Sequence, residues 1–206
     1  MKRHLTTALA ALVLAAAGTT ASAANVSFTG TLPGDNAVQL FSFTLDAISD
    51  VTLRSWSYAG GVNAAGQAIA AGGFDPLVTL FDGLGAGALL IDANDDGLGV
   101  AIDPVTGNAY DSLLELLALP VGSYTVALSQ FANFAGGPTL GDGFIGGGNA
   151  GFDGRSAAWA LDILSVARAS VIAEPSALAM ALLALFGAGL ASGSRGAARG
   201  RWRPAA

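Results

Sequence analysis

The stretch Gly122-Ser-Tyr-Thr-Val-Ala-Leu-Ser-Gln130 decides the fold prediction, because its larger apolar side chains alternate with smaller ones. Successive side chains of a strand point to opposite faces, so Tyr124, Val126 and Leu128 would share one face. The preceding Pro120-Val-Gly122 is a typical turn sequence. We therefore predict a β-strand over 122–130, entered through a tight turn.

Five further runs show the same kind of pattern. In 37–46 it places Phe41, Phe43 and Leu45 on one face. Short alternating runs separated by Gly, Pro and Asp predict a mainly β fold, an antiparallel, jelly-roll-like β-sandwich. The Gly- and Ala-rich stretches 59–73 and 135–154 are expected to be mobile loops. The other four predicted strands are 51–58, 77–82, 113–117 and 158–166, the last with Trp159, Leu161 and Ile163 on one side.

The N-terminus has the three parts of a secretory signal peptide. Lys2, Arg3 and His4 precede an apolar run over 5–17, and Ala21-Ser-Ala23 follows. Small residues at Ala21 and Ala23 are typical of a signal-peptidase site. We therefore predict a signal peptide over 1–23, export by the Sec machinery, and an exported domain over 24–170.

The C-terminus is predicted to be a sorting tail over 171–206. Residues 175–194 carry no charge, and a helix of that length spans about 30 Å of hydrocarbon. The arginines that follow would stay in the cytoplasm by the positive-inside rule, which places the exported domain outside. A buried or amphipathic terminal helix is the alternative. The four arginines of this Arg-rich end are Arg195, Arg199, Arg201 and Arg203.

The residue inventory excludes several kinds of site. Lys2 and His4 are the only Lys and His, and the chain has no Cys. After cleavage at Ala23, the protein would therefore lack the groups for a Ser-His-Asp triad, a Cys nucleophile, a Schiff-base Lys or a His- or Cys-ligated zinc ion. Residues 24–173 carry fourteen carboxylates against three arginines, a net charge of −11. Such a surface repels nucleic acid, and we predict no enzymatic activity.

The tail resembles a known sorting signal. Glu174-Pro-Ser176, the uncharged run and the terminal arginines occur in the order found in PEP-CTERM proteins of Gram-negative bacteria, with Ala173 at the position of the usual first Pro. The resemblance implies recognition by exosortase, which is thought to cut near this motif. It further implies transport across the inner membrane, transient anchoring in the membrane, and release to the cell surface or the extracellular matrix.

The exported domain carries a second resemblance, through three motifs in order. These are Phe74-Asp-Pro-Leu-Val-Thr-Leu-Phe-Asp82, Asn94-Asp-Asp-Gly97 and Leu119-Pro-Val-Gly-Ser-Tyr-Thr-Val126. They resemble the bacterial pre-peptidase C-terminal type of β-sandwich, in particular a subfamily with a Phe-Asp-Pro motif. The resemblance implies a non-catalytic accessory module, of a type in which some members bind calcium or polysaccharide. The turn chemistry independently predicts that Tyr124 is buried and that Asp75-Pro76 caps a strand entrance.

One acidic stretch is a candidate calcium site. Asp92, Asn94 and Asp96, followed by Gly97, have the spacing of the first half of a calcium loop, and Asp103 stands at the twelfth position. Oxygen ligands alternating on a tight turn can converge on Ca²⁺. An ordinary acidic turn is the alternative, because Asp, Asn and Gly are also the usual turn residues.

Two other functions stay open as alternatives. Exposed aromatic rings could stack on a polysaccharide, although core packing explains them equally well. Paired carboxylates could hydrolyse glycosides, but Glu115 is expected on the polar face of a strand. The prediction is a structural or adhesive protein of the cell envelope or extracellular matrix, linked to exopolysaccharide or biofilm. The alternatives are a calcium-dependent carbohydrate- or protein-binding module and a carboxylate-based glycoside hydrolase. The aromatic residues considered are Phe131, Phe134, Phe144 and Phe152 near loops, and Trp56, Tyr58 and Trp159 on strands.

Overall fold

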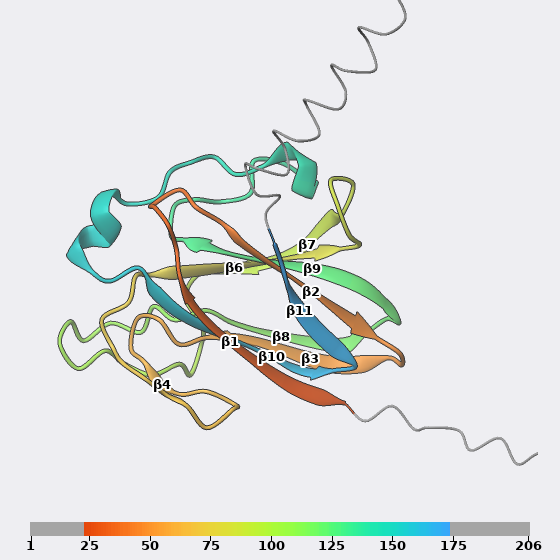
Figure 1. Cartoon of the computed structure of the whole chain (residues 1–206), viewed down its shortest axis with the longest axis horizontal. Coiled ribbons are helices and arrows are strands. Elements are labelled where there is room, and N and C mark those ends of the chain that lie inside the picture. Colours follow the sequence, from red (N-terminus) through yellow and green to blue (C-terminus); the bar gives the residue numbers. More distant parts are fainter. Residues whose placement is uncertain (1–22, 174–206) are drawn as a thin grey trace, which may run out of the picture.

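A computed structural model describes residues 23–173 of the chain (Figure 1). Within them the protein is mainly β, and every pairing between named strands is antiparallel. The predicted membrane helix and Arg-rich end, and all but the last residue of the predicted signal peptide, lie outside the described residues. Between residues 23 and 173, no helix is long and apolar enough to cross a membrane.

Two antiparallel sheets form the body of the protein and lie one above the other in Figure 1. One sheet has the strand order β1-β10-β3-β8, and the other has the order β11-β2-β9-β6-β7. A small hairpin, β4-β5, lies outside both. The bounds are β1 Ala24–Thr31, β2 Gln39–Leu45, β3 Ser49–Ser55, β4 Gly61–Val62, β5 Ala68–Ile69, β6 Pro76–Asp82, β7 Leu89–Asn94, β8 Leu113–Leu119, β9 Gly122–Gln130, β10 Ala158–Val166 and β11 Arg168–Ile172. Two short 3-10 turns, η1 Leu140–Asp142 and η2 Ala150–Gly154, lie between β9 and β10.

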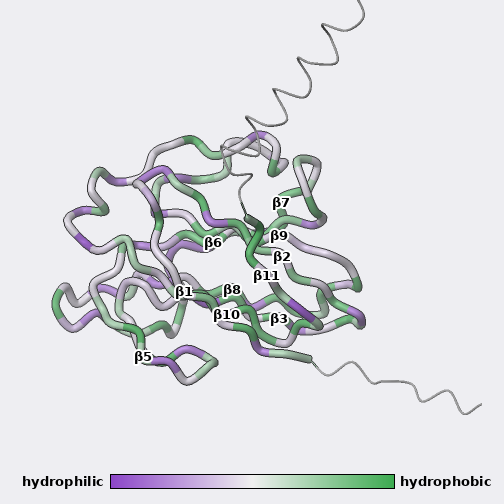
Figure 2. Tube along the Cα trace, viewed as in Figure 1, coloured by the Kyte–Doolittle hydropathy of each residue, from purple (hydrophilic) through white to green (hydrophobic). Residues whose placement is uncertain are grey.

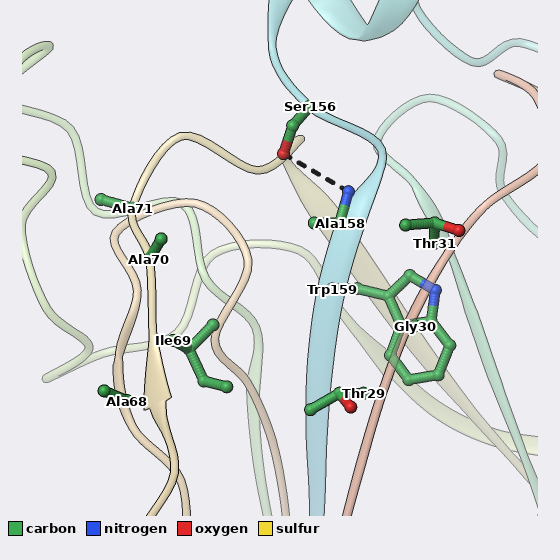
Figure 3. Close-up of a pocket in the computed structure, with 10 residues that line it drawn as sticks. All are labelled: Thr29, Gly30, Thr31, Ala68, Ile69, Ala70, Ala71, Ser156, Ala158 and Trp159. Atoms are coloured by element: carbon green, nitrogen blue, oxygen red, sulfur yellow. Dashed lines mark hydrogen bonds between the residues drawn. The ribbon is translucent and has the colours of Figure 1, made fainter.

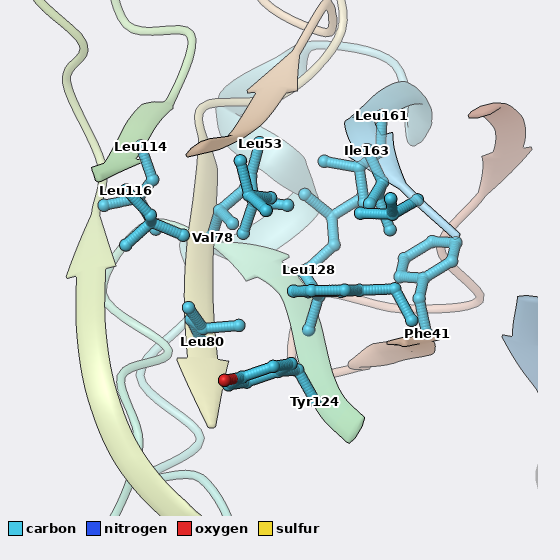
Figure 4. Packing of buried hydrophobic residues seen from close by; sticks show 14 of the residues in the cluster. Phe41, Leu53, Val78, Leu80, Leu114, Leu116, Tyr124, Leu128, Leu161 and Ile163 are labelled. Atoms are coloured by element: carbon cyan, nitrogen blue, oxygen red, sulfur yellow. The ribbon is translucent and has the colours of Figure 1, made fainter. Parts of the chain in front are cut away.

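The core lies between the two sheets. Leu53, Leu161 and Ile163 of the four-stranded sheet face Val126 and Leu128 of the five-stranded sheet in one buried cluster. Figure 4 shows how these layers interdigitate, and Figure 2 shows the hydrophobic residues recurring along the strands. Burial of this continuous apolar face is the main force holding the sheets together, since the chain contains no disulfide.

The predicted alternation is confirmed where it is strongest. Phe41, Phe43 and Leu45 of β2 are all buried. In the ladder between β2 and β9, Phe43 lies opposite Tyr124, and their rings stack with centroids 5.0 Å apart. The Tyr124 hydroxyl donates a hydrogen bond to the carbonyl of Pro120, which ties the strand to the turn before it. The six predicted strands all occur, with ends shifted by a few residues.

Three strands of the sheets were not predicted: β1, β7 and β11. In β7, the sequence Leu-Leu-Ile-Asp-Ala-Asn does not alternate, because five of its six residues are exposed on an edge strand. In β11, the hydrogen-bonded pairing continues to Ile172, past the expected end of the domain at residue 170. Edge strands bury little surface, so they leave a weak hydrophobic pattern in the sequence.

The Gly- and Ala-rich stretch 59–73 differs from the loop expected, because it contains the β4-β5 hairpin. This hairpin is tied to the outer face of the four-stranded sheet through Asp162, a buried residue of β10. The Asp162 carboxylate accepts hydrogen bonds from Trp56 Nε1, Ser27 Oγ and the backbone N–H of Ala64. At Gly61, φ is +142° and a Cβ would lie 2.7 Å from the Trp56 ring, so only glycine fits.

Candidate functional site

The Asp75 pocket is a cavity of about 220 Å³ at one end of the two sheets. It is built by segments that leave or enter strands: Tyr58 follows β3, Asp75 precedes β6, Gln130 ends β9 and Arg155 precedes β10. Neighbouring antiparallel strands run in opposite directions, so these alternating strand ends and starts meet at one end of the sheets. The pocket is lined by Tyr58, Asp75, Thr106, Tyr110, Gln130, Phe152, Asp153 and Arg155.

Asp75 is the most perturbed acid of the described chain. Its pKa is raised from the usual 3.8 to about 8, first by burial and then by the nearby carboxylates of Asp96, Asp95 and Asp111, against a lowering effect of Arg155. Its Oδ1 atom is shielded from solvent and has no hydrogen-bond partner among the described residues. A half-buried carboxylate whose Oδ1 is shielded and unpartnered disfavours its charged form, so Asp75 is mostly protonated at neutral pH. Strongly perturbed acids in a cavity are candidates for functional groups.

Gln130 supplies a second acceptor without a donor. The side chain is 1% exposed. Its Nε2 donates to the backbone carbonyl of Asn149, which fixes the orientation of the amide. Its Oε1 is buried and has no partner in the described part of the chain. Buried polar groups are nearly always hydrogen-bonded, so two unpartnered acceptors lining one pocket call for an explanation.

Arg155, another residue of the pocket lining, is held by several hydrogen bonds. Its Nε donates to the carbonyl of Gly73, and its Nη2 donates to the carbonyl of Tyr58 and to the carboxylate of Asp103. The guanidinium also lies over the Tyr58 ring, 3.7 Å from its centroid. The hydrogen bond from Arg155, together with two backbone N–H donors, holds the pKa of Asp103 below its usual value. The guanidinium of Arg155 therefore makes most of its interactions with other residues of the protein.

The turn η2, which contributes Phe152 and Asp153 to the pocket lining, has an unusual backbone. Gly151, Phe152 and Asp153 all have left-handed φ and ψ values. Two consecutive non-glycine residues in this region store strain that the surrounding structure must offset. The backbone N–H groups of Gly151 and Phe152 donate to the Asp35 carboxylate, and the Phe152 ring packs against Phe74 with centroids 5.4 Å apart. These contacts hold Phe152 and Asp153 at the pocket.

The predicted calcium residues do not meet as a group of four. Asp92 and Asn94 lie on the edge strand β7, and Asp96 follows in the exposed turn. Asn94 Oδ1 accepts from the backbone N–H of Leu113, and its Nδ2 donates to the carbonyl of Asp96. Asp103 is buried and paired with Arg155. Between residues 23 and 173, no group of three His, Cys, Asp or Glu side chains is placed to hold a metal ion. Calcium binding stays a prediction.

The predicted aromatic residues are spread over the core, the surface and the pocket. Trp159 packs in the core with its ring edge toward Phe41, and Phe131 packs against Phe134. Only Tyr58 and Phe152 of the seven line the Asp75 pocket, joined by Tyr110, whose ring lies 4.9 Å from that of Tyr58. Glu115 is exposed on β8, as predicted, and lies outside the pocket lining.

A second hollow of about 410 Å³ lies between the β4-β5 hairpin and strands β1 and β10. Figure 3 shows Ile69 and neighbouring alanines on one side, and Trp159, Gly30 and two threonines on the other. A Cβ on Gly30 would lie 2.5 Å from the Trp159 ring, so glycine there lets the ring approach the strand. Few of the side chains lining this groove are polar, and none is charged.

The sorting residues Glu174, Pro175 and Ser176, the four tail arginines and Ala21 lie outside the described residues. Ala23 is described and is exposed, directly before β1. The comparisons with known proteins add no assignment: no protein-family model matches the chain, and no curated protein matches it.

Sequence reasoning found Asp75 only as a strand cap. The signal that could have indicated more is Asp directly before a run that is apolar except for Thr79, because a residue next to the start of a strand buried on both faces lies close to the core. Nothing local in the sequence indicates that Gln130 and Arg155, far along the chain, join it.

Proposed function

We propose that the chain is an exported protein of the Gram-negative cell envelope or extracellular matrix, with a non-catalytic structural or adhesive role linked to exopolysaccharide or biofilm. The exported domain, residues 24–170, is a jelly-roll-like β-sandwich. A C-terminal tail of the PEP-CTERM type anchors it transiently in the membrane through a helix over about 175–194, until exosortase releases it.

One observation carries this proposal. The first strand begins at Ala24, directly after the signal cleavage site predicted from the sequence, and the last strand ends at Ile172, just before Glu174. The two sheets thus occupy the interval between the two predicted processing sites. The main core cluster of the described residues is built largely from the strands of these two sheets. The absence of His, Lys and Cys from 24–173 supports a non-catalytic role.

The experiment is fractionation in a Gram-negative host that has an exosortase. A C-terminal epitope after Ala206 is followed together with an antibody against the sandwich. The expected result is loss of the epitope and appearance of the sandwich outside the cell. The double substitution Glu174→Ala/Pro175→Ala should keep the epitope and leave the protein in the membrane fraction. A full-length product in the cytosol, with its leader attached, would refute the proposal.

Hydrolysis is a second candidate, favoured by one observation. Asp75, with a pKa near 8, and Asp153 line the same pocket, and glycosidases use a carboxylic acid together with a second carboxylate. Release of reducing ends from oligosaccharides by the purified chain, abolished by Asp75→Asn, would replace the non-catalytic proposal.

The calcium-dependent alternative has its own test. A ligand that binds only the folded state raises the melting temperature. If Asp92, Asn94 and Asp96 form a site, millimolar Ca²⁺ should raise the melting temperature of the wild-type chain and not that of Asp96→Asn. An equal shift in both, or no shift in either, would rule out a calcium site at this turn.

A further inference from the structure

We propose that the Asp75 pocket binds one ring of a neutral polysaccharide. This goes beyond the proposed function, because the pocket lies within residues 23–173 and its occupancy does not depend on how the tail is processed. The argument rests on the aromatic walls, on the unpartnered acceptors and on the charge balance of the cavity.

The aromatic walls are held in place by contacts within the protein. Tyr58 is fixed by Arg155 over its ring and by Tyr110 tilted against it, and its hydroxyl donates to Thr106. Phe152 is held against Phe74. Ordering side chains at the moment of binding costs free energy, so prearranged rings favour binding of a rigid ligand. The apolar faces of sugar rings pack against such aromatic side chains.

The polar groups of the Asp75 pocket match the hydroxyl groups of a sugar. Asp75 Oδ1 and Gln130 Oε1 are acceptors that no described residue satisfies. A buried acceptor without a donor carries a desolvation cost, so a donor that reaches it gains more than it would in water. A sugar ring offers hydroxyl donors around its edge and apolar C–H groups on its faces. This combination matches a cavity that has both acceptors and aromatic rings.

Charge and size favour a neutral ring over an ion. The Asp153 carboxylate in the pocket lining would repel a uronic acid or a sulfated sugar, and the domain as a whole carries a net charge of −11. Arg155, although paired with Asp103, adds a positive group to the wall and disfavours a cation. The volume of about 220 Å³ equals that of about seven waters, which suits one sugar ring better than a bare ion.

The test is a binding titration with the full chain, purified in a mild detergent. Neutral oligosaccharides of glucose, galactose or mannose are titrated and followed by saturation-transfer NMR and calorimetry. At least one should bind with a millimolar dissociation constant or tighter. Tyr110→Ala, which removes a half-buried ring, should weaken binding roughly tenfold. Tyr110→Phe, which keeps the ring, should weaken it less.

Two further variants separate a site effect from a folding effect. Asp75→Leu removes the acceptor at a similar side-chain size and should also reduce affinity, whereas Asp82→Leu, at an exposed position outside the pocket lining, should not. Thermal melting of each variant checks that it is folded. The proposal is overturned if no neutral oligosaccharide binds, or if binding survives both Tyr110→Ala and Asp75→Leu, which would place the ligand elsewhere. Calcium binding that Asp75→Leu abolishes and Tyr110→Ala leaves intact would also overturn it, in favour of a cation site. Failure of any kind here leaves the export experiment unaffected.

Discussion

Asp111 and Asp75 lie close together at the same end of the sheets, but their surroundings differ. The Asp111 carboxylate accepts hydrogen bonds from Ser55 Oγ and from the backbone N–H groups of Ser57, Tyr58 and Ala59. Asp75 Oδ1 accepts none from the described residues. Asp111 therefore holds the chain after β3 in place, whereas Asp75 lines a cavity and keeps its binding capacity free.

This difference distinguishes a structural acid from a candidate functional one. A buried carboxylate surrounded by donors is satisfied by the fold, so its removal should damage the fold. A buried carboxylate without donors costs the fold free energy, and a protein keeps such a group where something else uses it. Substitutions at the two positions should therefore change stability in opposite directions.

The largest effect is expected for Asp111→Asn. The amide group would turn an N–H toward backbone N–H groups, leaving buried donors without an acceptor. We expect unfolding to become easier by about 3 kcal/mol. Urea unfolding of the purified chain measures this, with Asp82→Asn as the exposed control. A loss below about 0.5 kcal/mol would show that Asp111 is not the structural acid described here.

Arg155→Gln should rank second. It removes the pairing with Asp103, which is 1% exposed, and the hydrogen bonds to two carbonyls. Breaking a buried ion pair leaves an uncompensated charge, and we expect a loss of about 2 kcal/mol, reduced because Arg155 is partly exposed. The same change should raise the pKa of Asp75 further, since Arg155 opposes that shift. NMR titration of the Asp75 carboxyl carbon checks this second expectation.

Asp75→Asn should stabilise the protein by about 1 kcal/mol near pH 8, a figure kept small because solvent screens a partly exposed group. The sign follows from linkage. The pKa of Asp75 is about 8 in the folded protein and near 3.8 when unfolded, so the folded state binds the extra proton between these values. Stability from this group is therefore greatest below about pH 4 and falls as the pH rises to about 8.

Thermal melts at pH 5 and pH 8 test this expectation. The wild-type chain should lose melting temperature between these values, and Asp75→Asn should lose less. Residues 24–173 contain no His, and the other carboxyl among them with a raised pKa is that of Asp96. Equal slopes for the two proteins would mean that Asp75 is ionised in both states.

The smallest effect is expected for Asp153→Asn. Asp153 lines the same pocket but is exposed, and its Oδ2 accepts only from Asn149 Nδ2 among the described residues. We expect a change within about 0.5 kcal/mol in urea unfolding. A larger loss would show that the left-handed turn of η2 depends on this hydrogen bond.

The sequence predicted the parts of the fold that depend on burial. Phe41, Tyr124 and Trp159 belong to strands with a strong period-2 pattern, and all three are buried. The edge strand β7 was missed, because its exposed Leu89 and Ile91 give no such pattern, and its Asp92 and Asn94 suggested a loop. Burial leaves a periodic signal in the sequence, and hydrogen bonding at a sheet edge does not.

The candidate site was less predictable than the fold. Tyr58 and Phe152 were noted as aromatic residues that a sugar could meet, but the pocket also needs Asp75, Gln130 and Arg155. These three lie at the ends of strands from both sheets, so the strand pairing within each sheet and the packing of one sheet on the other bring them together. Prediction of the pocket therefore required the sheet order, which the sequence patterns did not contain.

The position of β11 has a mechanical consequence. It is an edge strand of its sheet, and among the described residues it pairs only with β2 and is the last strand. If the proposed tail is held in a membrane while the domain is bound to its surroundings, a force directed away from the sheet edge acts first on Ile172. The hydrogen bonds to β2 would then yield one after another, starting at the Leu40 end, at lower force than if they had to break together. Cleavage of the proposed tail before any force acts would prevent this stepwise separation of β11 from β2.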